Sequence, residues 1–319
     1  MLLDGNNFTI FMSKKEIEIA KNRLSSGEVV IFPTETVYGI GCDATKDMAV
    51  NLLYKLKKRP KNNPIICHFA NLEDIKKNFY INKTELLLAE KFWPGPLTLI
   101  LKKKKISKIS PLVSNHNEYV GCRIPKNKIT QELLSKVKFP IAAPSANITS
   151  ETSVTLPEDL NPFFKENILI LNDGPAKLGL ESTVLKINKN IIEILRLGSL
   201  SEEMINKKIN NEIIINQKSN LSPGNLLKHY SPKKPLRMNI KSVNDNEGLL
   251  NFGSTNLFSK VFNLNLSSKG NLEEAANNFF HYIHLLDQSK CQKIAVVPIP
   301  NIGLGKTLND RLKRASFKN

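Results

Sequence analysis

The chain has 319 residues, of which 46 are basic and 29 acidic, giving a formal net charge of +17 at pH 7. Hydrophobic residues make up 41% of the sequence, which is enough to bury a core in each of about two domains and excludes disorder as the main state. No apolar run approaches the roughly 18 residues of a membrane span. The first eleven residues include Asp4 and lack the basic start of a secretory signal. We therefore expect a cytoplasmic protein without a membrane segment.

The four cysteines support the same location. Cys42, Cys67, Cys122 and Cys291 are scattered, with no pair at the spacing of a zinc ribbon. A disulfide-stapled secreted fold is also disfavoured by this spacing. The cysteines therefore fit a reducing cytosol, and no metal site is predicted from them.

Helical and strand patterns alternate through the first two thirds of the chain. Apolar residues recur at helical spacing near residues 47–58, 72–93 and 128–137. Short apolar runs, mostly β-branched or leucine-rich, predict strands at residues 28–32, 65–69, 97–101, 119–124, 140–143, 168–171, 183–187 and 191–197. The pattern indicates a mixed α/β (α+β) domain over residues 1–216.

The remainder of the chain divides into a linker and a second domain. Residues 217–235 have no helical or strand period and contain three prolines and a glycine, so we expect a long linker, which is usually functional or flexible. Residues 236–319 form a small α/β domain in this interpretation. Its predicted strands are residues 248–252, 257–264 and 293–298, and its predicted helices are residues 272–286 and 306–315.

Three short polar segments stand out from the packing pattern. Residues 33–39 directly follow a buried-looking strand, which is where α/β folds place ligands. Five of the seven residues in 55–61 are basic and can hold a polyphosphate. Ser145 and Asn147 stand two apart after a short apolar strand, so their side chains project to the same side. Each segment alone is also compatible with an ordinary turn or a solvated face.

Two glycine patterns and a histidine pair match known sites only loosely. Residues 303–307 end like a phosphate-binding P-loop, but Pro300 stands where that motif needs a glycine. Residues 39–44 fit only a loose dinucleotide fingerprint. His281 and His284 have no third metal ligand nearby, which favours partly buried helix histidines.

Taken together, the polar segments resemble the YrdC-type family of threonylcarbamoyl-AMP synthases, in its longer two-domain form. The similar segments run in order through nearly the whole chain, at residues 33–41, 57–59, 63–64, 68, 121–125, 145–147, 181–184, 195–198, 222–224, 228–232 and 303–315. The resemblance implies a YrdC-like twisted sheet with helices around a basic cleft, followed by a small Rossmann-like domain. It also implies synthesis of L-threonylcarbamoyladenylate from L-threonine, bicarbonate or CO2, and ATP, with release of pyrophosphate. That product serves N6-threonylcarbamoyladenosine formation at position 37 of tRNA.

The resemblance also assigns roles to individual residues. By position, the residues expected around threonine are Thr36, His68, Arg123, Ser145 and Ser182. Those that the resemblance places around ATP are Arg59, Asn63, Tyr119, Asn147, Thr155 and Arg196. His229 and Tyr230 are also expected near the triphosphate, because they lie in the long, polar, proline-rich linker. Lys57 and Arg59 are the expected catalytic residues, because they neutralise phosphate charge. The linker, which carries His229 and Tyr230, is expected to fold over the nucleotide as a lid.

The sequence also gives expectations for the cofactor and the partners. Mg2+ is expected to arrive with ATP, because no dense carboxylate cluster is present. A downstream tRNA-modifying transferase complex is the expected partner, and a weak tRNA contact would depend on the 15 basic residues after residue 216, where six are acidic. The alternative is an RNA-binding module, for tRNA or double-stranded RNA, without ATP turnover. The high charge favours it, whereas the scarcity of stacking aromatics does not.

Overall fold

The computed structural model describes residues 14–189, 191–209, 211–217, 219–224 and 229–317. The expectation that the first eleven residues are not a secretory signal concerns a segment outside the described residues. Within the described residues, no helix is long and apolar enough to cross a membrane.

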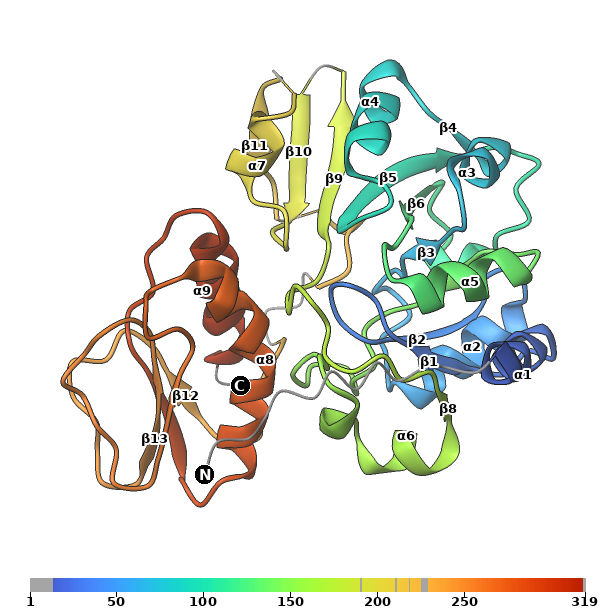
Figure 1. The fold of residues 1–319 in the computed structure, drawn as a ribbon. Coiled ribbons are helices and arrows are strands. Elements are labelled where there is room, and N and C mark those ends of the chain that lie inside the picture. The colour runs from blue at the N-terminus through green and yellow to red at the C-terminus, as the bar shows by residue number, and fades with distance from the viewer. Residues whose placement is uncertain (1–13, 190, 210, 218, 225–228, 318–319) are drawn as a thin grey trace.

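The larger part of the molecule is built on one mixed sheet of eleven strands (Figure 1). In chain order these are β1 Val30–Phe32, β2 Gly39–Asp43, β3 Cys67–His68, β4 Phe79–Tyr80, β5 Leu97–Lys103, β6 Tyr119–Arg123, β7 Ile141–Ala142, β8 Leu169–Ile170, β9 Thr183–Asn188, β10 Ile191–Arg196 and β11 Ile213–Ile215. Their order across the sheet is β11-β10-β9-β5-β6-β3-β7-β2-β1-β8, with β4 paired to β5. Parallel and antiparallel pairs alternate irregularly, as expected for a mixed α+β fold.

Helices cover both faces of this sheet because its central strands are apolar on both sides. They are α1 Lys14–Ser25, α2 Asp47–Leu56, α3 Leu72–Asn78, α4 Lys83–Phe92, α5 Lys128–Lys136, α6 Pro162–Asn167 and α7 Glu202–Asn206, with short 3-10 turns at Pro111–Ser114 and Pro157–Asp159. Val30 and Phe32 of β1 pack with α1 and α5. Ile31, between them, packs with α2 on the opposite face. This alternation within one strand defines two cores on either side of the sheet.

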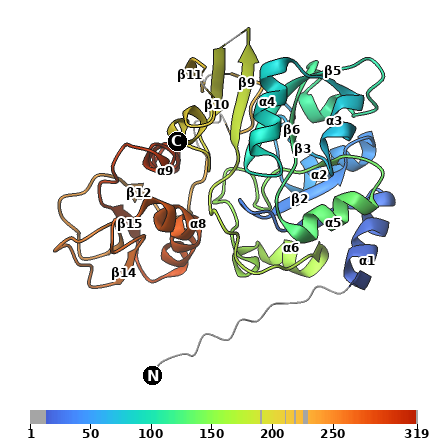
Figure 2. The same ribbon diagram turned by 45° about the horizontal axis from the view of Figure 1, so that its top comes forward.

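The smaller part has its own sheet and its own core. Its strands are β12 Leu236–Arg237, β13 Glu247–Asn251, β14 Phe262–Asn265 and β15 Lys293–Val296, in the order β12-β15-β13-β14 with every pair parallel. Its helices are α8 Leu272–Gln288 and α9 Leu304–Ala315. Figures 1 and 2 both show α8 and α9 on the side of this sheet that faces the larger part. The two helices therefore lie between the smaller sheet and the larger part.

Some elements differ from the sequence-based expectation. Residues 39–43 form the strand β2, which the sequence did not predict. A Cβ on Gly41 would lie 2.5 Å from Ile141 Cγ2 and 2.6 Å from a Phe32 ring carbon, so the glycine allows close approach within the sheet. The helices expected within 72–93 are α3 and α4, and the short strand β4 between them was not predicted. The strand expected at 257–264 begins only at Phe262.

Candidate active site

A cleft of about 580 Å3, a volume that includes its open mouth, lies among the strand ends of the large sheet. Its polar lining comes from the turn after β1, from β3, β6 and β10, and from the segments that follow β7 and precede β9. The charged and polar lining residues are Thr34, Thr36, Arg59, His68, Arg123, Ser145, Glu181, Ser182, Arg196, His229 and Tyr230.

All five residues predicted to surround threonine line this cleft. His68 and Arg123 are register partners on the adjacent parallel strands β3 and β6, so their side chains share one face. Arg123 donates from Nη2 to Glu35 Oε1 at 2.7 Å and from Nε to the Gly95 carbonyl at 3.2 Å. Its Nη1 has no hydrogen-bond partner among the described residues. The guanidinium is thus fixed on two sides and can still hold a carboxylate.

His68 is a neutral imidazole in this setting. Burial, and then the nearby Arg123 charge, lower the pKa of His68 to about 3. The edge of its ring meets the Phe32 ring at 6.0 Å between centres. Its Nδ1 is buried with no hydrogen-bond partner in the described protein. The ring can therefore exchange a hydrogen bond with a ligand but is a weak base at neutral pH.

The residues predicted to contact ATP divide into two groups. Arg59, Arg196, His229 and Tyr230 line the cleft. Arg59 donates from Nη2 to Asn63 Oδ1 at 2.7 Å, and Arg196 donates from Nη2 to the Ser182 carbonyl at 2.8 Å. Burial is the main cause that lowers the pKa of Arg59 to about 10, which still leaves it charged at neutral pH.

The second group, Asn63, Tyr119, Asn147 and Thr155, lies outside the cleft lining. Asn63 and Thr155 are buried, and Asn63 accepts a hydrogen bond from the cleft residue Arg59. Tyr119 lines a separate hollow that shares Pro64 with the cleft. Asn147 accepts from Ser145 Oγ at 2.5 Å and donates to the carbonyls of its own loop. The expectation that Ser145 and Asn147 lie together is met, but they bond each other.

Lys57 also lies behind the cleft lining. Its side chain is 1% exposed, and Nζ donates to the Ser145 carbonyl at 2.5 Å and to the Asn147 carbonyl. Burial, followed by repulsion from Arg59, lowers the pKa of Lys57 well below its usual value. Lys57 therefore holds the loop that carries Ser145, and its charge reaches the cleft only through space.

Several buried polar atoms of the predicted site residues have no hydrogen-bond partner in the described part of the chain. They belong to Asn63 (Nδ2), His68 (Nδ1), Thr155 (Oγ1) and His229 (Nδ1), each of which was singled out from the sequence. Buried donors and acceptors without partners are rare in native proteins and call for a bound ligand or water. The cleft thus has unused hydrogen-bonding capacity at both predicted binding regions.

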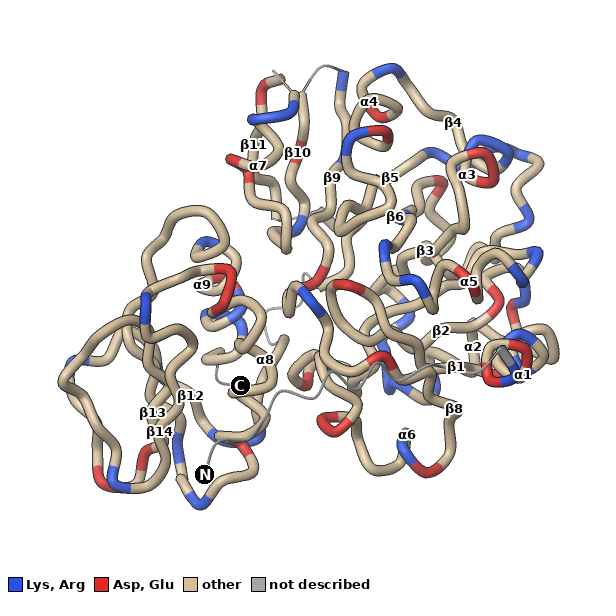
Figure 3. Tube along the Cα trace, viewed as in Figure 1, with Lys and Arg blue, Asp and Glu red and all other residues tan. Residues whose placement is uncertain are grey.

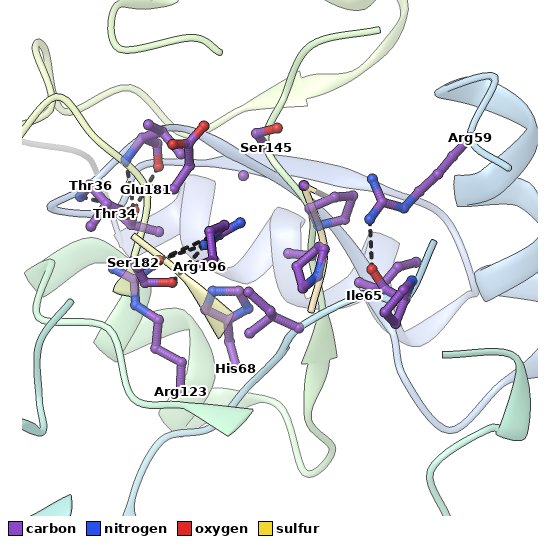
Figure 4. Close-up of a pocket in the computed structure, with 18 of the residues that line it drawn as sticks. Thr34, Thr36, Arg59, Ile65, His68, Arg123, Ser145, Glu181, Ser182 and Arg196 are labelled. Atoms are coloured by element: carbon purple, nitrogen blue, oxygen red, sulfur yellow. Dashed lines mark hydrogen bonds between the residues drawn. The ribbon is translucent and has the colours of Figure 1, made fainter. Parts of the chain in front are cut away.

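Figure 4 shows how these groups are distributed. Arg59 lies at one end of the pocket and Thr36, Ser182 and Arg123 lie at the other, with Arg196 between them in this view. Two separated sets of polar groups suit two ligands, or one ligand with two polar ends.

Sequence reasoning gave no site role to three residues of the lining. Thr34 accepts from the backbone N–H groups of Thr36 and Val37 and so shapes the turn. Glu181 and Gly224 also line the cleft. Each lies within a segment that the sequence had singled out, so membership of that segment was the available signal.

The fold and the cleft define an α/β enzyme-type site for small anionic ligands. Residues 22–198 match the family described as Telomere recombination (Sua5, YciO and YrdC), and residues 189–316 match the family described as Threonylcarbamoyl-AMP synthase, C-terminal domain. A threonylcarbamoyl-AMP synthase of Pyrococcus abyssi is 31% identical over 94% of this chain and 94% of its own length. One of Bacillus subtilis is 30% identical over 94% of this chain and 93% of its own.

A solved structure agrees with these sequence comparisons. The crystal structure of P. abyssi Sua5 complexed with L-threonine has a TM-score of 0.85 to this structure, at 29% identity, and covers 96% of this chain and 95% of that one. The chain therefore belongs to the threonylcarbamoyl-AMP synthase family.

Proposed function

We propose that the described cleft is where this chain makes threonylcarbamoyl-AMP. As a family member the chain is a threonylcarbamoyl-AMP synthase, which joins L-threonine, bicarbonate or CO2, and ATP and releases pyrophosphate. In this proposal residues 1–216 form the catalytic domain, residues 217–235 the linker, and residues 236–319 the second domain.

Threonine binds at the end of the cleft that carries Arg123. The guanidinium holds the amino-acid carboxylate through Nη1, because Nη2 and Nε are committed to Glu35 and Gly95. The hydroxyls of Thr36, Ser145 and Ser182, together with neutral His68, contact the hydroxyl and amine of the substrate. The bound L-threonine in the P. abyssi Sua5 crystal structure supports this choice of ligand.

ATP binds at the end that carries Arg59. Arg59 and Arg196 hold the triphosphate, and His229 and Tyr230 of the linker close over it. Asn63, Asn147, Thr155 and Tyr119 act from the surrounding layer, and Lys57 adds charge and holds the Ser145 loop. Among the described residues no group of three or more His, Cys, Asp or Glu side chains could hold a metal ion. Mg2+ would therefore be bound mainly by phosphate oxygens and water, as is usual for nucleotide complexes.

The chemistry follows from this placement. The threonine amine adds to CO2 to give a carbamate and loses a proton. A carbamate oxygen then attacks the α-phosphorus, the bond to the bridging oxygen breaks, and pyrophosphate leaves. The protein contributes position and charge neutralisation, which suits a cleft that holds three guanidinium groups.

The observation that carries the proposal is the set of unpartnered buried atoms. Nδ1 of His68 lies at the threonine end, and Asn63 Nδ2 and His229 Nδ1 lie at the nucleotide end. Leaving buried polar groups unpaired costs about 1–3 kcal/mol each, so a ligand that pairs them recovers this energy on binding.

The product would then be used for tRNA modification. A reactive mixed anhydride needs prompt transfer, which favours a downstream tRNA-modifying transferase complex as partner. Any direct tRNA contact would be weak and salt-sensitive, since it depends on dispersed lysines. All four cysteines are buried and unpaired, in keeping with a cytoplasmic location.

The test is an assay of pyrophosphate release with ATP, threonine and bicarbonate. Release should depend on threonine, and the adenylate should be detectable by mass spectrometry. Pyrophosphate release that ignores threonine would overturn the proposal. Salt-sensitive RNA binding with no turnover would instead favour the RNA-binding alternative.

A further inference from the structure

One guanidinium from the smaller part reaches the back of the cleft. Arg311 of α9 is fully buried, and its Nε donates to Glu181 Oε2 at 3.1 Å. Its Nη2 donates to the Leu197 carbonyl at 2.6 Å. The guanidinium carbon also lies 4.6 Å from the centre of the Tyr230 ring. Arg311 therefore touches both the catalytic part and the linker.

The contacts of Arg311 flank two cleft residues. Glu181 directly precedes Ser182, and Leu197 directly follows Arg196. The second carboxylate oxygen of Glu181 accepts from Ser153 Oγ at 2.5 Å, so this side chain is fixed from two directions. The start of β9 and the end of β10 are thus tied together behind the cleft by one side chain of the other part.

The contact with Tyr230 fixes the linker in a conformation that needs support. Tyr230 has a φ of +60°, which non-glycine residues rarely adopt. Its ring lies against Arg311 on one side and against Phe280 of α8 at 5.7 Å between centres. A guanidinium over an aromatic ring is attracted by the electron-rich ring face, more strongly when both groups are buried.

We propose that Arg311 is a positioning residue through which the smaller part holds the cleft and its linker in the shape that binds ATP. This inference rests on the proposed function, because Tyr230 and Arg196 matter here as ATP-binding residues. The second part then acts on catalysis by bracing the first, through one buried side chain that itself stays outside the cleft.

A neighbouring residue provides a matched control. Lys306 lies on the same helix and also reaches the larger part, where Nζ bonds Glu202 at 3.1 Å and Glu203 at 3.0 Å. Lys306 is not part of the cleft lining, and its hydrogen bonds within the described residues go to Glu202 and Glu203 rather than to the linker. Lys306→Ala therefore removes a contact between the parts without touching Glu181, Leu197 or Tyr230.

The experiment measures threonine-dependent pyrophosphate release at varied ATP for the full-length protein. We expect Arg311→Lys to raise the KM for ATP about tenfold, because lysine keeps the positive charge but lacks the several fixed N–H donors of the guanidinium. Tyr230→Ala should raise the KM for ATP by a similar factor. The KM of the double variant should be at most about twofold above that of Tyr230→Ala, because both changes remove the same contact between Arg311 and Tyr230. Multiplicative losses in the double variant, or an equal loss in Lys306→Ala, would overturn the inference.

A second pair of variants keeps the test valid even if Arg311→Lys does not fold. Tyr230→Phe keeps the ring that faces Arg311, and Tyr230→Leu removes it, while both lack the hydroxyl. The Phe variant should have a KM for ATP about fivefold lower than the Leu variant. Equal values would contradict the inference. If the wild type shows no threonine-dependent release, the proposed function itself fails, which is a different result.

Discussion

Three buried guanidinium groups supply the positive charge of the cleft at the scale of single residues. Arg59, Arg123 and Arg196 each give part of their hydrogen-bonding fork to protein oxygens. Those bonds offset much of the cost of burying the charge and fix the direction of the remaining N–H groups. Most lysines lack such fixation, so the arginines were the more informative basic residues in the sequence.

Arg123 should discriminate between the two substrates. We expect Arg123→Ala to raise the KM for threonine about 100-fold, roughly the 2–3 kcal/mol of a lost charge-assisted pair, and to leave the KM for ATP within about threefold. Steady-state kinetics with each substrate varied in turn would measure this. Because the change also removes the ion-pair partner of Glu35, which then keeps only the Lys126 N–H among the described residues, thermal unfolding must first show a folded variant. Equal losses for both substrates would contradict the assignment.

His68 should make the stability of the protein depend on pH. The folded protein holds the pKa of His68 at about 3, whereas the ordinary value is 6.5. Between these values the unfolded chain binds more protons, so stability is lost as pH falls below about 6.5. The contribution of His68 is up to about 1.4 kcal/mol per pH unit.

Urea unfolding at several pH values tests this expectation with the variant His68→Gln. Between pH 6.5 and pH 5 the wild type should lose stability more steeply than the variant. Above pH 7.5 the unfolding free energies of the two proteins should change with pH in parallel, because His68 is neutral there in both the folded and the unfolded state. Equal slopes across the acidic range would show that the buried imidazole is not the cause.

At the scale of elements, the sequence predicted the periodic segments well and the short ones poorly. The helices α5 and α8 and the long strand β5 show clear periods or apolar runs and were found nearly at their observed bounds. The strand β2 was not predicted. The close packing of its Gly41 against Ile141 depends on a residue distant in sequence and cannot be read locally.

The linker is the element whose role can be tested most directly. Tyr230 packs in the core of the smaller part, while the next residue, Ser231, donates its N–H to the Ser150 carbonyl of the larger part at 2.8 Å. We expect Tyr230→Ala to raise the KM for ATP about tenfold and to speed escape of the adenylate, because the linker loses its anchor. Quench-flow measurement of bound and released product would detect the change. Unchanged kinetics would count against a lid.

At the scale of the whole molecule, the sequence predicted two parts but not how they meet. The histidine pair on α8 shows why. His281 lies 2.9 Å from Asp159 and His284 lies 3.2 Å from the Ser153 carbonyl, so both belong to the interface between the parts. Neither partner is near in sequence. Figure 3 shows the Lys and Arg positions spread over both parts, so net charge gave no guide to the contact either.

A pair of glycines can test whether this contact maintains the cleft. Gly179 and Gly174 both have a positive φ, of +70° and +67°, so alanine is strained at each by about 1 kcal/mol. A Cβ on Gly179 would also lie 2.2 Å from the Ala276 carbonyl oxygen of α8, whereas a Cβ on Gly174 would meet nothing within 4 Å. The difference between the two variants therefore isolates the contact between the parts.

We expect Gly179→Ala to lose about 1–3 kcal/mol more unfolding free energy than Gly174→Ala, since backbone atoms cannot yield as side chains do. Its KM for ATP should also rise, because displacing α8 shifts Phe280 and with it the support of Tyr230. Urea unfolding and ATP-dependent kinetics on the same preparations measure both effects. Equal stability and equal KM in the two variants would mean that the parts are not coupled through this interface.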